Sequence, residues 1–130
     1  MSREHARNEW SVIVLHEGYL ELRWLPSTAG LGDDAFAATV RWFASETERT
    51  RPRGILSDAV DLRHKPGEEA MAWRRTEIIP RYGEAGVRRF AFLVAPGHPD
   101  AGRETVEGPA VFPTRWFVDR AEAVAWLLAA

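Results

Sequence analysis

The chain has 130 residues and a mass of 14.7 kDa, the size of one ordinary domain, and folding can remove about two-thirds of its surface from water. A hydrophobic fraction of 45% with six Trp and six Phe excludes a disordered chain, and the absence of Cys excludes a disulfide scaffold and a thiolate metal site. The net charge of -2 gives no basic excess for binding nucleic acid. The charged N-terminus and the lack of an 18-residue apolar run predict a cytoplasmic protein without a membrane segment.

The first structural element is expected near Trp10. Residues 1–8 are polar and unpatterned, so we interpret them as a disordered N-terminal tail ahead of a single domain over 9–130. A strand is predicted from Trp10 to Leu15, and a cleanly alternating strand follows over 19–25. Gly18 supplies the turn between them, so the domain opens with a hairpin.

A helix and a buried strand follow the hairpin. The Pro- and Gly-containing stretch 26–32 is a loop, and apolar residues at helical spacing predict a helix over 34–48. A short buried strand is predicted over 55–62, and its polar end is the first place where the pattern stops describing a core.

The next helix begins at Glu68 and keeps its apolar period as far as Pro80. Pro80 must kink or end this helix, because it has no N–H to donate to the carbonyl four residues back. A last turn through Tyr82 is expected to close at Gly86 in a left-handed cap, and a strand is predicted over 87–94.

The end of the chain contains a long loop, a strand and a short helix. The loop covers 96–109, the strand 111–118, and Asp119 caps the terminal helix. Alternating strands and helices require crossover connections, so we expect a single α/β domain with a mixed sheet of about five strands and helices packed mainly on one face. Ligand or partner contacts in such sheets lie at the carboxyl ends of the parallel strands, here 57–64 and 95–98.

Several segments together resemble the SpoIIAA-like branch of the STAS domains, a group of small bacterial proteins, over about residues 10–129. The resemblance lies in the order and spacing of the segments EGYLELRW, RGILSDAVDL, EEAMAWRRTEIIPRYGEAG, VRRFAFLVAP and TRWFVDRAEAVAWL. Its most specific part is the ending D-x-x-E-A-x-x-W-L, made by Asp119, Glu122, Ala123, Trp126 and Leu127. The resemblance implies a compact α/β domain that acts by binding a partner protein, such as an anti-sigma kinase, or a small or lipid-like ligand.

The phosphorylation switch of that family is not expected here. Its antagonists carry a phosphorylatable Ser in a D-S-x-G pattern after the third strand. When Asp58 is placed on the Asp of the pattern, Ala59 occupies the acceptor position. Ser57 lies one residue early, where strand alternation points it to the opposite side from its neighbour.

Asp58, Asp61 and His64 form the sharpest candidate for chemistry. Their spacing of three could bring them together on a helical turn as metal ligands or acid/base groups. The alternative, which we favour, is a polar loop whose carboxylates cap the following helix and pair with arginines.

Other polar residues have similar alternatives. His16 and Glu17 could be a catalytic pair, but a solvated turn is favoured. His98 could belong to a lid, but a loop tip is favoured. Trp42 and Trp73 could form an interface patch or a pocket rim, with ordinary packing favoured. The arginines at 74–75, 81 and 88–89 could bind a phosphate or carboxylate, but interleaved glutamates favour a self-neutralised face.

No Walker, G-x-G-x-x-G, H-E-x-x-H or G-x-S-x-G motif is present, and we expect no cofactor. The sequence therefore predicts a non-enzymatic binding or regulatory domain that acts through a partner protein or a small or lipid-like ligand, with a homodimer as one open arrangement. The alternative is a small enzyme or metal-binding protein that uses the cluster of Asp58, Asp61 and His64. The candidate binding residues are Ser57, Asp58, Asp61, His64, Trp73 and His98.

Overall fold

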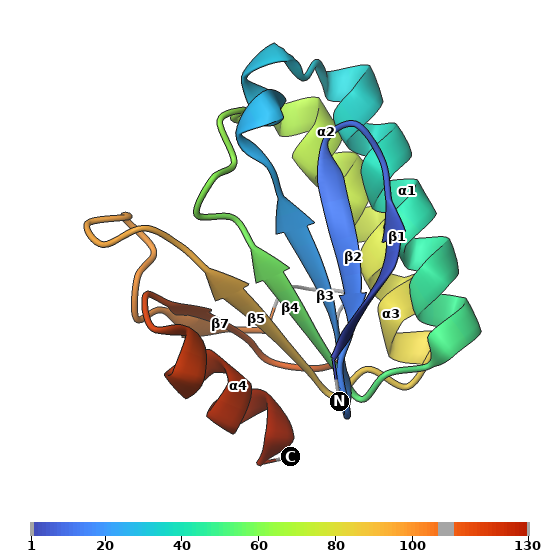
Figure 1. The fold of residues 1–130 in the computed structure, drawn as a ribbon, viewed down its shortest axis with the longest axis vertical. Helices are drawn as coiled ribbons and strands as arrows, with labels where there is room; N and C mark the ends of the chain where they lie inside the picture. Colours follow the sequence, from blue (N-terminus) through green and yellow to red (C-terminus); the bar gives the residue numbers. More distant parts are fainter. Residues whose placement is uncertain (1, 107–110, 130) are drawn as a thin grey trace.

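The computed structural model describes residues 2–106 and 111–129 and shows a single α/β domain built on a seven-stranded mixed sheet (Figure 1). The strand order is β1-β2-β3-β4-β5-β7-β6. The strands are β1 (Arg3–Arg7), β2 (Ser11–Leu15), β3 (Tyr19–Trp24), β4 (Gly54–Asp58), β5 (Arg89–Leu93), β6 (Glu104–Thr105) and β7 (Thr114–Phe117). The helical segments are the 3₁₀ turn η1 (Pro26–Gly30), α1 (Asp33–Thr50), α2 (Glu68–Trp73), the π-helical turn η2 (Arg74–Ile78), α3 (Ile79–Glu84) and α4 (Arg120–Leu128).

The mixed α/β class is confirmed, but the expected count of about five strands is wrong, because β1 and β6 were not foreseen. Residues 3–7, expected in a disordered tail, pair antiparallel with β2 at the edge of the sheet. An edge strand needs only one backbone ladder and no apolar stripe, so the polar segment REHAR gave no strand signal. β6 is a two-residue strand inside the predicted loop 96–109, of which residues 107–109 lie outside the described part.

The centre of the sheet is parallel. β3, β4, β5 and β7 are paired in parallel, while β1, β2 and β6 add antiparallel pairs at the two sides. The crossovers run through α1 and through α2–η2–α3, which cover one face of the sheet, and α4 covers the other (Figure 1). The carboxyl ends of β3, β4 and β5 therefore meet at one edge of the sheet, next to the loop 59–66.

Two hydrophobic clusters fill the spaces between these layers. On the larger face, Phe36, Val40 and Phe43 of α1 pack with sheet residues such as Ile13 and Ile55. On the opposite face, α4 places the buried residues Ala123 and Leu127 over a cluster made by Tyr19, Leu56, Ala91, Leu93 and Phe117. Most of the helical residues are on one face, as expected.

The helical segment does not end at Pro80 but continues to Glu84, and a π-helical turn precedes the proline. α2 and α3 are joined by the π-helical turn η2, in which the N–H of Ile79 donates to the carbonyl of Arg74, five residues back. Pro80 lies in the first turn of α3, where its missing N–H costs least. Gly86 has the expected positive φ, of 101°, just after this helix.

Two predicted strands are shorter in the structure. The strand predicted over 55–62 ends at Asp58, and the one predicted over 111–118 begins at Thr114. No helix within residues 2–106 and 111–129 is both long and apolar enough to cross a membrane.

Candidate functional site

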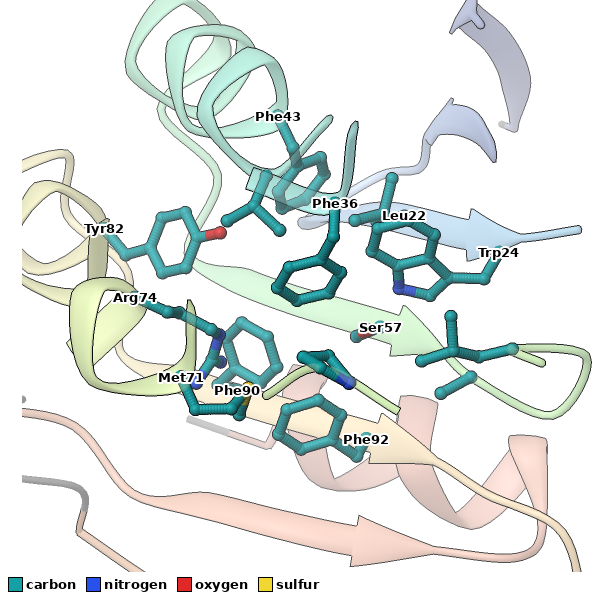
Figure 2. A pocket seen from close by; sticks show the side chains of 14 residues that line it. Leu22, Trp24, Phe36, Phe43, Ser57, Met71, Arg74, Tyr82, Phe90 and Phe92 are labelled. Atoms are coloured by element: carbon teal, nitrogen blue, oxygen red, sulfur yellow. The ribbon is translucent and has the colours of Figure 1, made fainter. Parts of the chain in front are cut away.

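An apolar cavity of about 120 Å³ lies between the sheet and the helices of its larger face, at the carboxyl ends of β3, β4 and β5 (Figure 2). The strands contribute its floor, α1 and the α2–α3 segment contribute its walls, and the loop 59–66 borders it. The lining residues are Leu22, Trp24, Phe36, Val40, Phe43, Ser57, Ala59, Leu62, Pro66, Met71, Arg74, Tyr82, Phe90 and Phe92. A concave, mainly apolar site with a few polar groups has the character of small-molecule sites.

Six of the fourteen lining residues are aromatic, and several of these rings pack against one another. Trp24 stacks on Phe36 with ring centroids 5.5 Å apart, and Tyr82 lies 5.9 Å from Phe90. Phe90 and Phe92, on the same face of β5, are 4.9 Å apart. Because these rings come from two strands and two helices, the shape of the cavity is fixed by the core of the fold.

Arg74 brings a charge to this apolar site. Its side chain runs from η2 toward the sheet and is only 5% exposed as a residue (Figure 2). The guanidinium carbon lies 5.4 Å from the centroid of Phe90 and 5.5 Å from that of Phe92, within the range of a cation–π contact. A charged side chain in a largely buried, aromatic setting makes Arg74 a candidate for function.

Two hydroxyl groups also belong to the lining. Ser57 of β4 and Tyr82 of α3 are both buried residues whose side chains line the cavity. Burial raises the pKa of Tyr82 to about 12, although the positive charges of Arg74 and Arg81 act in the opposite direction. Tyr82 therefore stays protonated and able to donate at any physiological pH.

A more polar groove borders the cavity. Ala59, Leu62 and Pro66 line both the cavity and a groove of about 610 Å³ between the loop 59–66 and the segment 94–100. Arg63, His64, Lys65, His98 and Asp100 also line the groove. His64 is anchored there, because its Nε2 lies 2.8 Å from Oδ1 of Asp33 at the start of α1. The groove gives the cavity a polar mouth.

The predicted site residues are distributed over three places. Ser57 lines the cavity, whereas His64 and His98 lie in the neighbouring groove. Trp73 lies in a separate groove between α1 and α2, with the guanidinium carbon of Arg41 5.1 Å from its ring centroid. Trp73 is therefore on a helical surface and not at the strand ends.

The structure does not bring Asp58, Asp61 and His64 together. Asp58 follows Ser57 in β4 and points to the opposite face of the sheet, where it pairs with Arg120. Asp61 is exposed, and its backbone carbonyl accepts a 3.3 Å hydrogen bond from the Thr28 hydroxyl. Within the described residues, no three His, Cys, Asp or Glu side chains are grouped so that they could hold a metal ion.

The opposite face holds a buried ionic cluster that sequence reasoning missed. Glu21 of β3 is fully buried and accepts hydrogen bonds from both terminal nitrogens of Arg120, at 3.1 and 3.0 Å. Arg23 Nε lies 3.1 Å and His16 Nε2 2.7 Å from the same carboxylate, so His16 is not in a solvated turn. Burial raises the pKa of Glu21, but the hydrogen bonds from Arg120 and His16 outweigh it, and the net pKa is lowered.

The cavity as a whole was also missed, because its aromatic residues have the pattern of ordinary core positions. One signal could have indicated it. Arg74 occupies the apolar stripe of its helix between Met71 and Ile78, where a charged residue needs a specific environment. Comparison of the chain with family models, with curated proteins and with solved structures finds no match.

Proposed function

We propose that this chain is a non-enzymatic, cytoplasmic binding domain of the SpoIIAA-like type, which takes a small and largely apolar ligand in the cavity beneath α1 and α2. The observation that carries the proposal is the cavity itself, because its aromatic rings and its few polar groups are arranged by the core of the fold. Closing over a ligand would involve the loop 59–66, which lines both the cavity and the groove. A partner protein would detect the bound state at this loop.

The alternative of an enzyme or a metal-binding protein has less support. Its three candidate groups contact different partners, with Asp58 on Arg120 and His64 on Asp33. A nucleophile, its base and an oxyanion site are needed together for acyl transfer, and the described part of the cavity offers no such set.

The test is a titration of isotopically labelled protein with small aromatic and aliphatic compounds, followed by amide chemical shifts. We expect the shifts to concentrate at residues of the cavity lining. The Ala59→Leu variant should weaken binding by about tenfold or more, because the larger side chain takes space at the cavity wall, a loss of about 1.4 kcal/mol or more. The matched control is Ala38→Leu, an identical change on the exposed face of α1, which should bind like the wild type.

Two results would contradict the proposal. If no compound perturbs the cavity residues, the cavity is only a packing defect. If Ala59→Leu binds as tightly as the wild type, the ligand is held elsewhere.

A further inference from the structure

Two surface grooves border the cavity, and Lys65 lines both of them. The larger groove, of about 610 Å³, has three residues in common with the cavity, namely Ala59, Leu62 and Pro66. The second groove, of about 550 Å³, has Pro66 and Met71 in common with it. A ligand whose apolar part fills the cavity can therefore extend past Pro66 to the side chain of Lys65.

The loop 59–66, which carries Lys65, is held in place at two points. The backbone N–H of Arg63 donates a 2.8 Å hydrogen bond to the hydroxyl oxygen of Thr28, a fully buried residue. The Nε2 atom of His64 lies 2.8 Å from Oδ1 of Asp33 at the start of α1. Because these contacts fix the backbone of the loop, Arg63 and Lys65 stay next to the cavity.

The larger groove has an excess of positive charge. Arg63 and Lys65 are both exposed, and neither forms an ion pair within the described residues. Asp100 also lines this groove, but its carboxylate is already paired with Arg103 at 3.2 Å. The Nδ1 atom of His98 accepts the backbone N–H of Asp100, so the neutral ring carries its proton on Nε2 and adds a donor. The groove therefore suits an anionic group.

The cavity limits the size of the apolar part of a ligand. An engineered apolar cavity of about 150 Å³ binds benzene, so at the same space per carbon atom a cavity of about 120 Å³ accommodates about five carbon atoms. A charged group would lose its water inside this mainly apolar space. Arg74 is already engaged with other groups of the protein, so the cavity offers an anion no free cation. We therefore expect the charged part of the ligand to lie outside the cavity.

We propose that the ligand is a short aliphatic monocarboxylate, whose chain of about four or five carbon atoms lies in the cavity and whose carboxylate lies in the groove beside Arg63 and Lys65. This inference rests on the proposed function, because it assigns a ligand class to the same cavity. Water and salt screen the attraction between a carboxylate and exposed cations, so most of the affinity comes from the chain. Each methylene that enters the cavity should strengthen binding by about fourfold until the space is full.

The first experiment measures how binding depends on the length of the chain. Butyrate, pentanoate, hexanoate and octanoate are titrated into isotopically labelled protein, and dissociation constants are obtained from the amide chemical shifts of cavity residues. We expect the affinity to rise by about fourfold per methylene from butyrate to hexanoate and to rise no further for octanoate. A rise that continues unchanged through octanoate would contradict the inference, because the chain would then not be confined to the cavity.

The second experiment compares pentanoate with pentanamide, which share the chain and differ in the charge of the terminal group. Binding at low salt is measured for the wild type, for the double variant Arg63→Gln/Lys65→Gln and for the control Arg53→Gln/Arg88→Gln. The control removes the same charge from two exposed arginines at the opposite ends of β4 and β5. We expect the wild type and the control to prefer the carboxylate by about three- to fivefold, as for a screened ion pair. Arg63→Gln/Lys65→Gln should lose that preference and still bind pentanamide.

The possible failures of the inference and of the proposed function can be distinguished. Equal binding of pentanoate and pentanamide to the wild type would overturn the inference and leave the proposed function standing, because both chains would still occupy the cavity. A carboxylate preference that survives Arg63→Gln/Lys65→Gln would also overturn it, because the anion would then be bound elsewhere. If neither compound binds while other small apolar compounds do, the assigned ligand class is wrong, and if none binds, the proposed function is wrong as well.

Discussion

Ser57 and Asp58 are neighbours in β4, yet they serve opposite faces of the sheet. Side chains alternate along a strand, so Ser57 faces the cavity while Asp58 faces α4. This alternation is the part of the site that the sequence could predict, since it requires only a strand and its register. The partner of Asp58, Arg120, lies 62 residues further along the chain and has no local signal.

The position of Ser57 leads to a prediction about modification. Ser57 is 5% exposed and lies beneath helices, and Ala59 occupies the family's acceptor position. We therefore expect no stoichiometric phosphate on residues 57–64 after incubation with a serine kinase of the kind that modifies SpoIIAA-like antagonists. Intact-mass measurement followed by peptide mapping checks this. A phosphorylated Ser57 would contradict it, whereas a phosphate mapped to the exposed Ser27 would not.

The burial of Arg74 could not be predicted from the sequence. The position of Arg74 in the sequence and the residues around it fit equally well with a solvated arginine in a self-neutralised helix face. The structure turns it inward because η2 adds a residue to one helical turn just before Pro80. A π turn depends on the packing of the helix against the sheet, and one-dimensional periodicity does not record it.

At the scale of the element, strong apolar periodicity predicted α1 and the central strands well, and weak periodicity failed. α1 is predicted over 34–48 and observed from Asp33 to Thr50, because its apolar stripe is long and regular. β1 has no apolar stripe, and it is held by the backbone ladder to β2 and by the 2.7 Å contact of His5 with Glu46 on α1. Contacts of that kind depend on which segments the fold brings together, so they could not be predicted from a local pattern.

The end of α3 gives a second prediction, because Gly86 combines a positive φ with open space. Its φ is 101°, and a Cβ atom there would meet nothing within 4 Å, so the cost of Gly86→Ala comes from backbone strain alone. We expect a loss of about 1–2 kcal/mol in the free energy of unfolding. Chemical denaturation checks this.

Gly30 provides the matched control. Its φ lies outside the left-handed region, and an added Cβ would make only an ordinary contact 3.9 Å from the Trp10 ring. Gly30→Ala should therefore be neutral or slightly stabilising, by less than about 1 kcal/mol. A loss of equal size in both variants would show that the backbone angle at Gly86 is not the cause.

At the scale of the whole molecule, the two faces of the sheet have different roles. The face beneath α1 and the α2–α3 segment contains the cavity, and the face beneath α4 contains the ionic cluster around Glu21. Glu21 connects β3 to the first residue of α4, while Asp58 connects the end of β4 to the same arginine. The carboxylates therefore fix α4 to the strands whose opposite face holds the proposed ligand site.

This arrangement predicts that Glu21→Gln destabilises the protein in a pH-dependent way. Removing one member of a buried pair costs about 3–5 kcal/mol, but Arg120 and Arg23 keep access to water, so we expect about 2 kcal/mol at pH 7. The pKa of Glu21 is lowered below 4.5 in the folded state. The charge of Glu21 therefore stabilises the fold above that pH, and its contribution is lost as the pH falls through the lower, folded-state pKa.

Unfolding free energies of the wild type and Glu21→Gln, measured by denaturant titration from pH 7 down to pH 3, check this prediction. The difference between them should shrink as the pH falls. Glu48→Gln is the matched control, because Glu48 pairs with Arg81 at 2.6 Å on the surface, and an exposed pair contributes less than about 1 kcal/mol. A difference for Glu21→Gln that is as small as that of the control, or that grows toward low pH, would show that α4 is held by its apolar contacts and not by Glu21.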